Sequence, residues 1–223
     1  MKRAARPSST LPRGALFLLE DLLWRVGLRR IAGADEVGVG PLAGPVVAAA
    51  VVFPPGVLVE GLADSKRLSA ATRQRLDIEV RARATVSVAA VEPPEVDRIN
   101  IYQARLKALR LAVEGLREAP EFVLVDGREI PGLGCRQSAY VKGDGFVASI
   151  AAASIVAKVH RDALMHELHR CYPMYGFARN MGYGTAAHLA ALQRFGPSPV
   201  HRRSFRPVAV QTTDVEPGLF PGS

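Results

Sequence analysis

Two kinds of apolar pattern alternate along the chain. Helices are predicted where apolar residues recur three and four positions apart, or where a polar cap precedes a helix-forming run, over 16–26, 69–83, 101–118, 148–169 and 186–195. A further helical segment is expected after Pro93 and Pro94. Continuous apolar runs predict strands over 30–35, 46–53, 85–91 and 122–125. This alternation predicts an α/β fold, in which helices pack against a sheet.

The two ends of the chain lack this pattern. Residues 1–14 are basic and rich in proline and serine, so a flexible tail is expected there, and a second one over 209–223. Residues 15–208 are expected to form a single domain with a helical C-terminal part. A chain of this length buries a substantial core without disulfides or metals.

Membrane and export signals are not found in the sequence. The longest apolar run, 43–53, is well short of the ~20 residues that a membrane-spanning helix needs. The apolar segment 15–19 runs directly into Glu20 and Asp21, which excludes a signal peptide there. Cys135 and Cys171 have no partner at CxxC spacing and are expected to be reduced thiols. We therefore expect a cytoplasmic monomer with no membrane partner.

The charge of the chain indicates a polyanionic partner. Lysine and arginine together number 29 against 21 acidic residues, which gives a net charge of +8, and most of the basic residues are arginines. The arginine fork matches phosphate oxygens, so nucleic acid is one expected partner. Solubility alone is the alternative explanation for the charge.

Four carboxylates stand where predicted strands or helices begin and end. Asp35 and Glu36 follow a strand and precede a glycine-rich turn. Because successive strand residues point to opposite faces, both can serve one site only if the chain bends, and the glycines permit a bend. Asp126 ends another strand, and Asp144 precedes the alanine-rich helix. As alternatives, Asp126 could form a local Asx turn and Asp144 could be a helix N-cap.

Converging carboxylates in a chain without a Cys/His cluster suit Mg²⁺ or Mn²⁺. In a basic protein, such a site suits hydrolysis of a phosphodiester by two metal ions.

Seven stretches in order resemble the ribonuclease HII family, the type 2 ribonucleases H. They are GADEVGVGPLAGPV (33–46), DSKRLS (64–69), VDG (125–127), VKGD (141–144), SIAAASIVAKVHRD (149–162), YPMYGFARNMGYGT (172–185) and GPSPVHRRSFRPV (196–208). The resemblance covers about 16–208. It implies a ribonuclease H-like mixed β-sheet flanked by helices, with a C-terminal helical extension.

The resemblance implies that Asp35, Glu36, Asp126 and Asp144 are the catalytic carboxylates that bind Mg²⁺ or Mn²⁺. Asp162 competes with Asp144 for the fourth place. The span from 144 to 162 would be about 27 Å in a continuous helix, so the two cannot share one site if that helix is unbroken. We expect Asp162 to pair with Lys158 instead.

The family hydrolyses the RNA strand of RNA–DNA hybrids and nicks duplex DNA on the 5′ side of an embedded ribonucleotide, leaving a 3′-hydroxyl and a 5′-phosphate. Both nucleic acids are therefore expected partners. By the same resemblance, the turn Gly38, Val39 and Gly40 senses the 2′-hydroxyl. Tyr183 stacks on the sugar at the RNA–DNA junction, unless it is only a packed loop tyrosine. The positions expected to touch phosphates are Ser65, Lys66, Lys142, Arg202, Arg203 and Ser204.

Two positions depart from the family pattern. Val39 stands where the family turn has an arginine, which questions efficient cleavage at single ribonucleotides, and Asn180-Met181 replaces a His-Lys pair. The alternatives are a ribonuclease HIII-like enzyme with poor single-ribonucleotide activity, a hybrid-binding module with impaired catalysis, or a related two-metal nuclease such as a junction resolvase. Leu219 and Phe220 could bind a sliding clamp, although a disordered tail is the simpler expectation.

Overall fold

A mixed five-stranded sheet forms the centre of the protein. The computed structural model describes residues 15–213, so the predicted tail over 1–14 and the part of the second predicted tail from 214 onward lie outside the described residues. The strand order is β3-β2-β1-β4-β5. β2 pairs antiparallel with β1 and β3, and β4 pairs parallel with β1 and β5. The strands are β1 (Ile31–Val37), β2 (Val46–Val52), β3 (Thr85–Val91), β4 (Phe122–Asp126) and β5 (Arg136–Tyr140).

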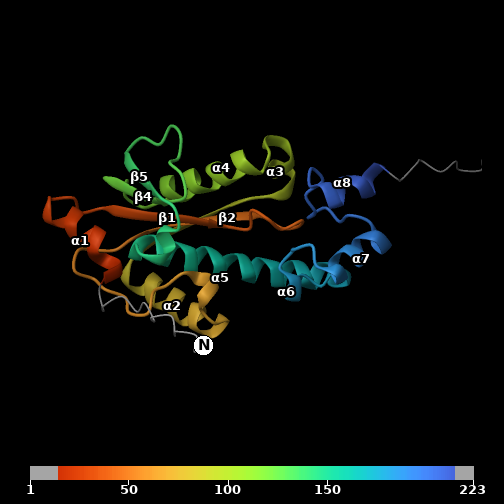
Figure 1. Ribbon diagram of the computed structural model, residues 1–223, viewed down its shortest axis with the longest axis horizontal. Helices are drawn as coiled ribbons and strands as arrows, with labels where there is room; N and C mark the ends of the chain where they lie inside the picture. The colour runs from red at the N-terminus through yellow and green to blue at the C-terminus, as the bar shows by residue number, and fades with distance from the viewer. Residues whose placement is uncertain (1–14, 214–223) are drawn as a thin grey trace, which may run out of the picture.

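Helices cover both faces of the sheet and extend past one end (Figure 1). α3 (Pro93–Ile99) and α4 (Ile101–Glu114) lie on one face, and α2 (Ala70–Arg83) and α5 (Ala148–Cys171) on the other. α6 (Phe177–Asn180), α7 (Ala186–Phe195) and α8 (Arg206–Thr213) form the C-terminal extension. The remaining elements are η1 (Ala15–Phe17), α1 (Leu18–Arg25), η2 (Ser65–Arg67), η3 (Gly143–Gly145) and η4 (Pro173–Tyr175). The mixed sheet flanked by helices, with a helical C-terminal extension, agrees with the predicted architecture.

The small residues of β1 and α5 allow these two elements to approach closely. A Cβ atom on Gly33 would lie 2.1 Å from the carbonyl carbon of Ser149. The first turns of α5, through Ala157, are buried, which explains their high alanine content. Apolar side chains of β1 and β2 fill a core against α5 on one face and against α4 on the other. The position of α5 along β1 is therefore set by close packing.

Several elements differ from the prediction. β5 was not predicted because it is a polar edge strand, RQSAY, which lacks the apolar run of a buried strand. α8 continues to Thr213, so the predicted domain boundary at 208 falls inside a helix. The motif segment 172–185, for which no helix was predicted, contains η4 and α6. Between residues 15 and 213, no helix is both long and apolar enough to cross a membrane.

Candidate active site

Asp35 and Glu36 lie on opposite sides of β1. The strand stays paired with β2 through Val37, with Asp35 opposite Ala49 and Glu36 opposite Ala48, so the bend expected between the two acids is not present. Asp35 therefore faces α5, where it accepts a hydrogen bond from the Ser154 hydroxyl. Glu36 faces α4 and forms an ion pair there. The condition that one site requires a bend is therefore wrong, because the two carboxylates flank an unbent strand and the charge of Asp126 still acts on both.

Asp126 is the acid that links both sides of the strand. It ends β4, the parallel neighbour of β1, and its charge acts on Asp35, Glu36 and Asp144. Its Oδ1 accepts a 2.7 Å hydrogen bond from the backbone N–H of Gly143. This partner lies far along the chain, so the side chain makes a tertiary contact and does not form the local Asx turn considered as an alternative.

Asp144 completes the acidic group from the segment between β5 and α5. It lies in η3 and is buried, whereas the N-cap of α5 is Val147, so the N-cap alternative is excluded. Its Oδ2 is 3.7 Å from Lys66 Nζ. The nearby charge of Asp64 also raises the pKa of Asp144. A fifth carboxylate is thus present that the sequence prediction did not include.

Burial is the main cause that raises the pKa of Asp35, Glu36 and Asp144. Repulsion from neighbouring carboxylates raises these pKa values further. At Glu36, the Arg105 guanidinium acts in the opposite direction, although burial outweighs it. The site is therefore electrostatically strained when its acids are ionised and no further cation is present.

One buried carboxylate oxygen of Glu36 indicates that the acids fit a divalent cation. Arg105 Nε lies 2.6 Å from Glu36 Oε1, while the buried Oε2 has no hydrogen-bond partner among the described residues. A buried carboxylate oxygen without a partner is costly unless a cation or a proton satisfies it. Across residues 15–213, no three acidic, histidine or cysteine side chains already converge on one preformed metal centre. Arg105 and Lys66 instead hold two of the acids in ion pairs.

The glycine turn and Tyr183 lie next to each other. Gly38 has φ +89°, and a Cβ there would be 2.3 Å from Arg161 Nε, so only glycine fits. A Cβ at Gly40 would lie 3.6 Å from Tyr183 Cε1. Tyr183 is 48% exposed. The two elements predicted to read the sugar are thus brought together at the surface, with Val39 partly buried between the glycines.

The predicted phosphate contacts separate into exposed and buried groups. Lys66, Lys142 and Arg203 are exposed. Ser65 is buried, and its hydroxyl is 2.9 Å from that of Ser154. Ser204 is exposed, but its hydroxyl donates a 2.6 Å hydrogen bond to Asp97.

Arg202 was predicted to touch phosphates, yet the structure places it inside the protein. Its side chain is fully buried, and its guanidinium donates to the backbone carbonyl groups of Gly38, Val39 and Gly44. A guanidinium in this position does not face solvent. Its contacts instead support the glycine turn from inside the protein, so the prediction that Arg202 touches phosphates is wrong.

Two predictions concerning α5 are confirmed. The helix is continuous from Ala148 to Cys171, and Lys158 Nζ forms a 2.6 Å ion pair with Asp162 Oδ1. Asp162 is therefore an intrahelical partner, while Asp144 lies before the helix begins. Arg105 and Ser154 were not predicted as site residues because each occupies an ordinary helical position in the sequence. Asp64, in contrast, directly precedes Ser65 in the motif DSKRLS (64–69), so the motif offered a signal for it.

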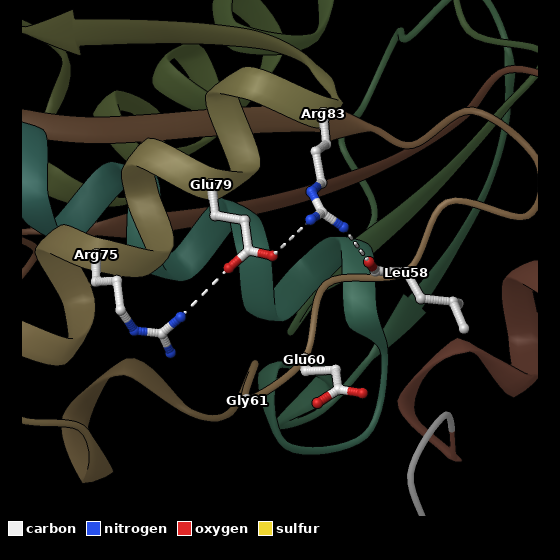
Figure 2. Close-up of a pocket in the computed structure, with 6 residues that line it drawn as sticks. All are labelled: Leu58, Glu60, Gly61, Arg75, Glu79 and Arg83. Carbon is white, nitrogen blue, oxygen red and sulfur yellow. Dashed lines mark hydrogen bonds and ion pairs between the residues drawn. The ribbon is translucent and has the colours of Figure 1, made fainter.

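A hollow elsewhere on the surface contains charged residues but none of these acids. It is lined by residues of α2 and of the segment before it (Figure 2). Glu79 lies between Arg75 and Arg83 and pairs with both, and Arg83 also donates to the carbonyl group of Leu58. Because these charges satisfy one another, the acidic group at the sheet remains the candidate active site.

The mixed sheet, with acids at the adjoining ends of β1 and β4, defines a nuclease of the ribonuclease H class. The model of the family described as ribonuclease HII matches residues 32–208. The ribonuclease HII of Xanthobacter autotrophicus is 54% identical over 93% of this chain and 82% of its own length. The chain therefore belongs to the ribonuclease HII family, and it is a ribonuclease H that hydrolyses RNA–DNA hybrids.

Solved structures agree with this assignment. The ribonuclease H2 from Pyrococcus horikoshii OT3 superposes with a TM-score of 0.72 at 25% identity, over 82% of this chain and 97% of that one. The structure of Bst-RNase HIII in complex with Mn²⁺ superposes with a TM-score of 0.66 at 18% identity, over 94% of this chain and 76% of that one. The second likeness establishes the shared fold alone.

Proposed function

We propose that this ribonuclease H cleaves on the 5′ side of ribonucleotides, both in hybrids and singly embedded in duplex DNA, with two divalent ions held by Asp35, Glu36, Asp126 and Asp144. The products would carry a 3′-hydroxyl and a 5′-phosphate. The observation that supports this most strongly is that the charges of four carboxylates around β1 and β4 act on one another, while the buried Glu36 Oε2 has no hydrogen-bond partner among the described residues.

Mg²⁺ or Mn²⁺, when bound, activates the attacking water and stabilises the leaving oxygen. The chain itself supplies oxygen ligands on both sides of β1 and positions them. Ser154 orients Asp35, Gly143 orients Asp126, and Arg105 holds one oxygen of Glu36. The Mn²⁺ complex of Bst-RNase HIII, which has the same fold, is consistent with such a site.

The substrate would be read beside this site. Exposed backbone at Gly40 and the exposed ring of Tyr183 are adjacent, which suits contact with a ribose and its 2′-hydroxyl. Lys66, Lys142 and Arg203 are exposed cations that suit phosphates. Net charge +8 predicts duplex binding that weakens with salt and depends little on sequence.

The decisive assay uses two labelled substrates, a DNA duplex with one ribonucleotide and an RNA–DNA hybrid, each with Mg²⁺, with Mn²⁺ and with a chelator. We expect cleavage of both only with metal, and a nick 5′ of the single ribonucleotide that carries a 3′-hydroxyl and a 5′-phosphate. Cleavage that persists in the chelator would contradict the two-metal site. Cleavage of the hybrid alone would contradict the single-ribonucleotide activity.

One observation favours a second candidate, a hybrid nuclease with poor activity at single ribonucleotides. Val39 carries no charge and is partly buried in the turn, so the turn offers only backbone groups. The ratio of the two rates in the same assay separates the candidates. Binding to a sliding clamp through Leu219 and Phe220 stays a prediction, because both lie outside the described residues.

A further inference from the structure

A chain of buried hydrogen bonds ends on the backbone of Tyr183. The carbonyl oxygen of Tyr183 lies 2.8 Å from His188 Nδ1, and His188 Nε2 lies 3.0 Å from His201 Nε2. The far nitrogen of His201, Nδ1, is 3.0 Å from the backbone N of Ser198 and 2.8 Å from its hydroxyl. Both imidazoles are buried, so these contacts are their hydrogen-bonding environment.

The positions of the protons on the two imidazoles follow from one group that can only donate, the backbone N–H of Ser198. The backbone N–H of Ser198 can only donate, so His201 Nδ1 accepts and the proton of a neutral ring is on Nε2. His201 Nε2–H then donates to His188 Nε2, which leaves His188 Nδ1–H to donate to Tyr183. Burial lowers the pKa of both rings, that of His201 to about 4, in agreement with two neutral imidazoles.

The groups that face the two rings are mainly aromatic. The Tyr175 ring lies 4.7 Å from the His201 ring, and the Phe177 ring lies 5.4 Å from the His188 ring, centroid to centroid. The next residue along the chain, Arg202, directs its cation at carbonyl oxygens and away from the histidines. The two imidazoles are thus neutral and enclosed, and their hydrogen bonds have one fixed direction. This arrangement suits a structural relay, in which one ring holds the position of the next.

Arg202 extends the same backbone segment to the glycine turn. Its Nη2 donates to the Gly38 carbonyl at 2.6 Å and its Nη1 to the Val39 carbonyl at 3.0 Å. The backbone N–H of Arg202 donates to the Leu42 carbonyl, and Leu42 N–H donates to the Gly182 carbonyl, each at 2.8 Å. One pair of consecutive residues therefore holds both the turn and the segment that carries Tyr183.

We propose that His201 and Arg202, acting with His188, form one buried positioning element that fixes the distance between Tyr183 and the glycine turn. This inference rests on the proposed function, in which the turn and Tyr183 contact the ribose. None of the three residues touches the substrate; they set the width of the space between Gly40 and the Tyr183 ring. Val39 adds no charge to the turn, so the ribose would be contacted by the backbone of the turn and by the Tyr183 ring, whose separation this element sets.

Two substitutions of the same histidine test the relay. Asparagine places its amide nitrogen where His188 has Nδ1, so His188→Asn keeps the bond to Tyr183. Glutamine places its amide near the Nε2 position, so His188→Gln keeps the contact with His201 and loses Tyr183. We expect KM for the single-ribonucleotide duplex to rise about tenfold in His188→Gln and less than about threefold in His188→Asn, with kcat nearly unchanged.

The control is His166→Gln, on an exposed position of α5, which is expected to leave KM unchanged. Tyr183→Ala is measured in parallel. If Tyr183→Ala raises KM but His188→Gln and His188→Asn behave alike, the relay is overturned and the substrate contact stands. If Tyr183→Ala leaves KM unchanged, the proposed contact of Tyr183 fails, and the inference fails with it.

A measurement on the unsubstituted protein tests the relay even if a variant does not fold. Nitrogen-15 NMR of the imidazoles distinguishes a proton on Nδ1 from one on Nε2. We expect the Nδ1–H form for His188 and the Nε2–H form for His201 at neutral pH. The same tautomer in both rings, or a charged ring, would overturn the relay. Arg202→Lys, which retains the charge but not the fork, is expected to raise KM about tenfold as well.

Discussion

Arg105 Nε lies 2.6 Å from Glu36 Oε1, and both side chains are largely shielded from water, 21% and 9% exposed. The arginine thus supplies a counter-charge to one candidate metal ligand while leaving the other oxygen of that ligand free. Arg105 also donates to the carbonyl group of Asp126. It connects the two halves of the acidic site from α4.

Removing this arginine is expected to destabilise the metal-free protein. Arg105→Met leaves Glu36 as an uncompensated buried charge, so the free energy of unfolding in a chelator should fall by about 3 kcal/mol. Glu36→Gln in the same background should restore part of the loss. Urea unfolding measures both. The matched control is Arg98→Met, which breaks an exposed pair with Glu95 and should change the unfolding free energy little, because solvent screens such pairs. Equal losses in the two variants would contradict a special role for Arg105.

Asp35→Asn is expected to stabilise the metal-free protein at neutral pH while abolishing cleavage. Burial, then repulsion from Glu36 and Asp126, raises the pKa of Asp35 well above its ordinary value of about 4. The folded state therefore binds this proton more tightly than the unfolded state does, and stability from this group is lost as pH rises through the folded pKa.

The stability advantage of Asp35→Asn over the unsubstituted protein should accordingly be small near pH 4 and grow towards pH 8. Thermal unfolding in a chelator across this range measures it. Mg²⁺ should raise the midpoint of the unsubstituted protein and have less effect on the variant. An advantage that is constant with pH would show that the carboxylate is not strained in the folded state.

Asp126→Asn is expected to reduce cleavage by at least about a thousandfold and leave hybrid binding largely intact, because the amide keeps the shape but not the charge needed by a cation. Single-turnover cleavage and a gel-shift assay measure the two properties. Asp162→Asn provides the control: its partner is Lys158 within α5, so activity should remain near that of the unsubstituted protein. Nearly full activity in Asp126→Asn would overturn the assignment of the site.

Gly33→Ala is expected to cost about 1–3 kcal/mol or more, because the new methyl group would lie 2.1 Å from the backbone of Ser149 and push α5 away from β1. Chemical denaturation measures the loss. Gly134→Ala is the matched control, since nothing lies within 4 Å of a Cβ at that glycine. Similar unfolding midpoints for the two variants would contradict the close packing described here.

Val39→Arg is expected to raise the rate on the single-ribonucleotide duplex about tenfold relative to the hybrid, through a charge-assisted contact beside the site. Val39→Leu keeps an apolar side chain and should leave the ratio unchanged. The two-substrate assay measures both ratios. An unchanged ratio in Val39→Arg would show that backbone groups alone determine selectivity in this turn.

The sequence predicts those features that leave a local pattern. Strands such as β2 and β3 are apolar runs, and Asp35 and Asp126 stand at the ends of such runs. β5 escapes prediction because an edge strand with half-buried polar residues has no apolar period. Arg202 shows the other limit: a basic run is typical of a solvated surface, and only the fold reveals that carbonyl groups of the distant glycine turn surround this guanidinium.

The continuous helix α5 contacts the acidic site and the glycine turn at two different positions along its length. Ser154 bonds to Asp35, and two turns further on Arg161 donates to the carbonyl groups of Ala43, Pro45 and Met181. These two positions are about 10 Å apart along the helix. Because one rigid helix joins them, the proposed cleavage site and the proposed ribose contact would be separated by a fixed length of helix. The enzyme would thus select the cleaved bond by measurement from the ribose, whatever the bases are.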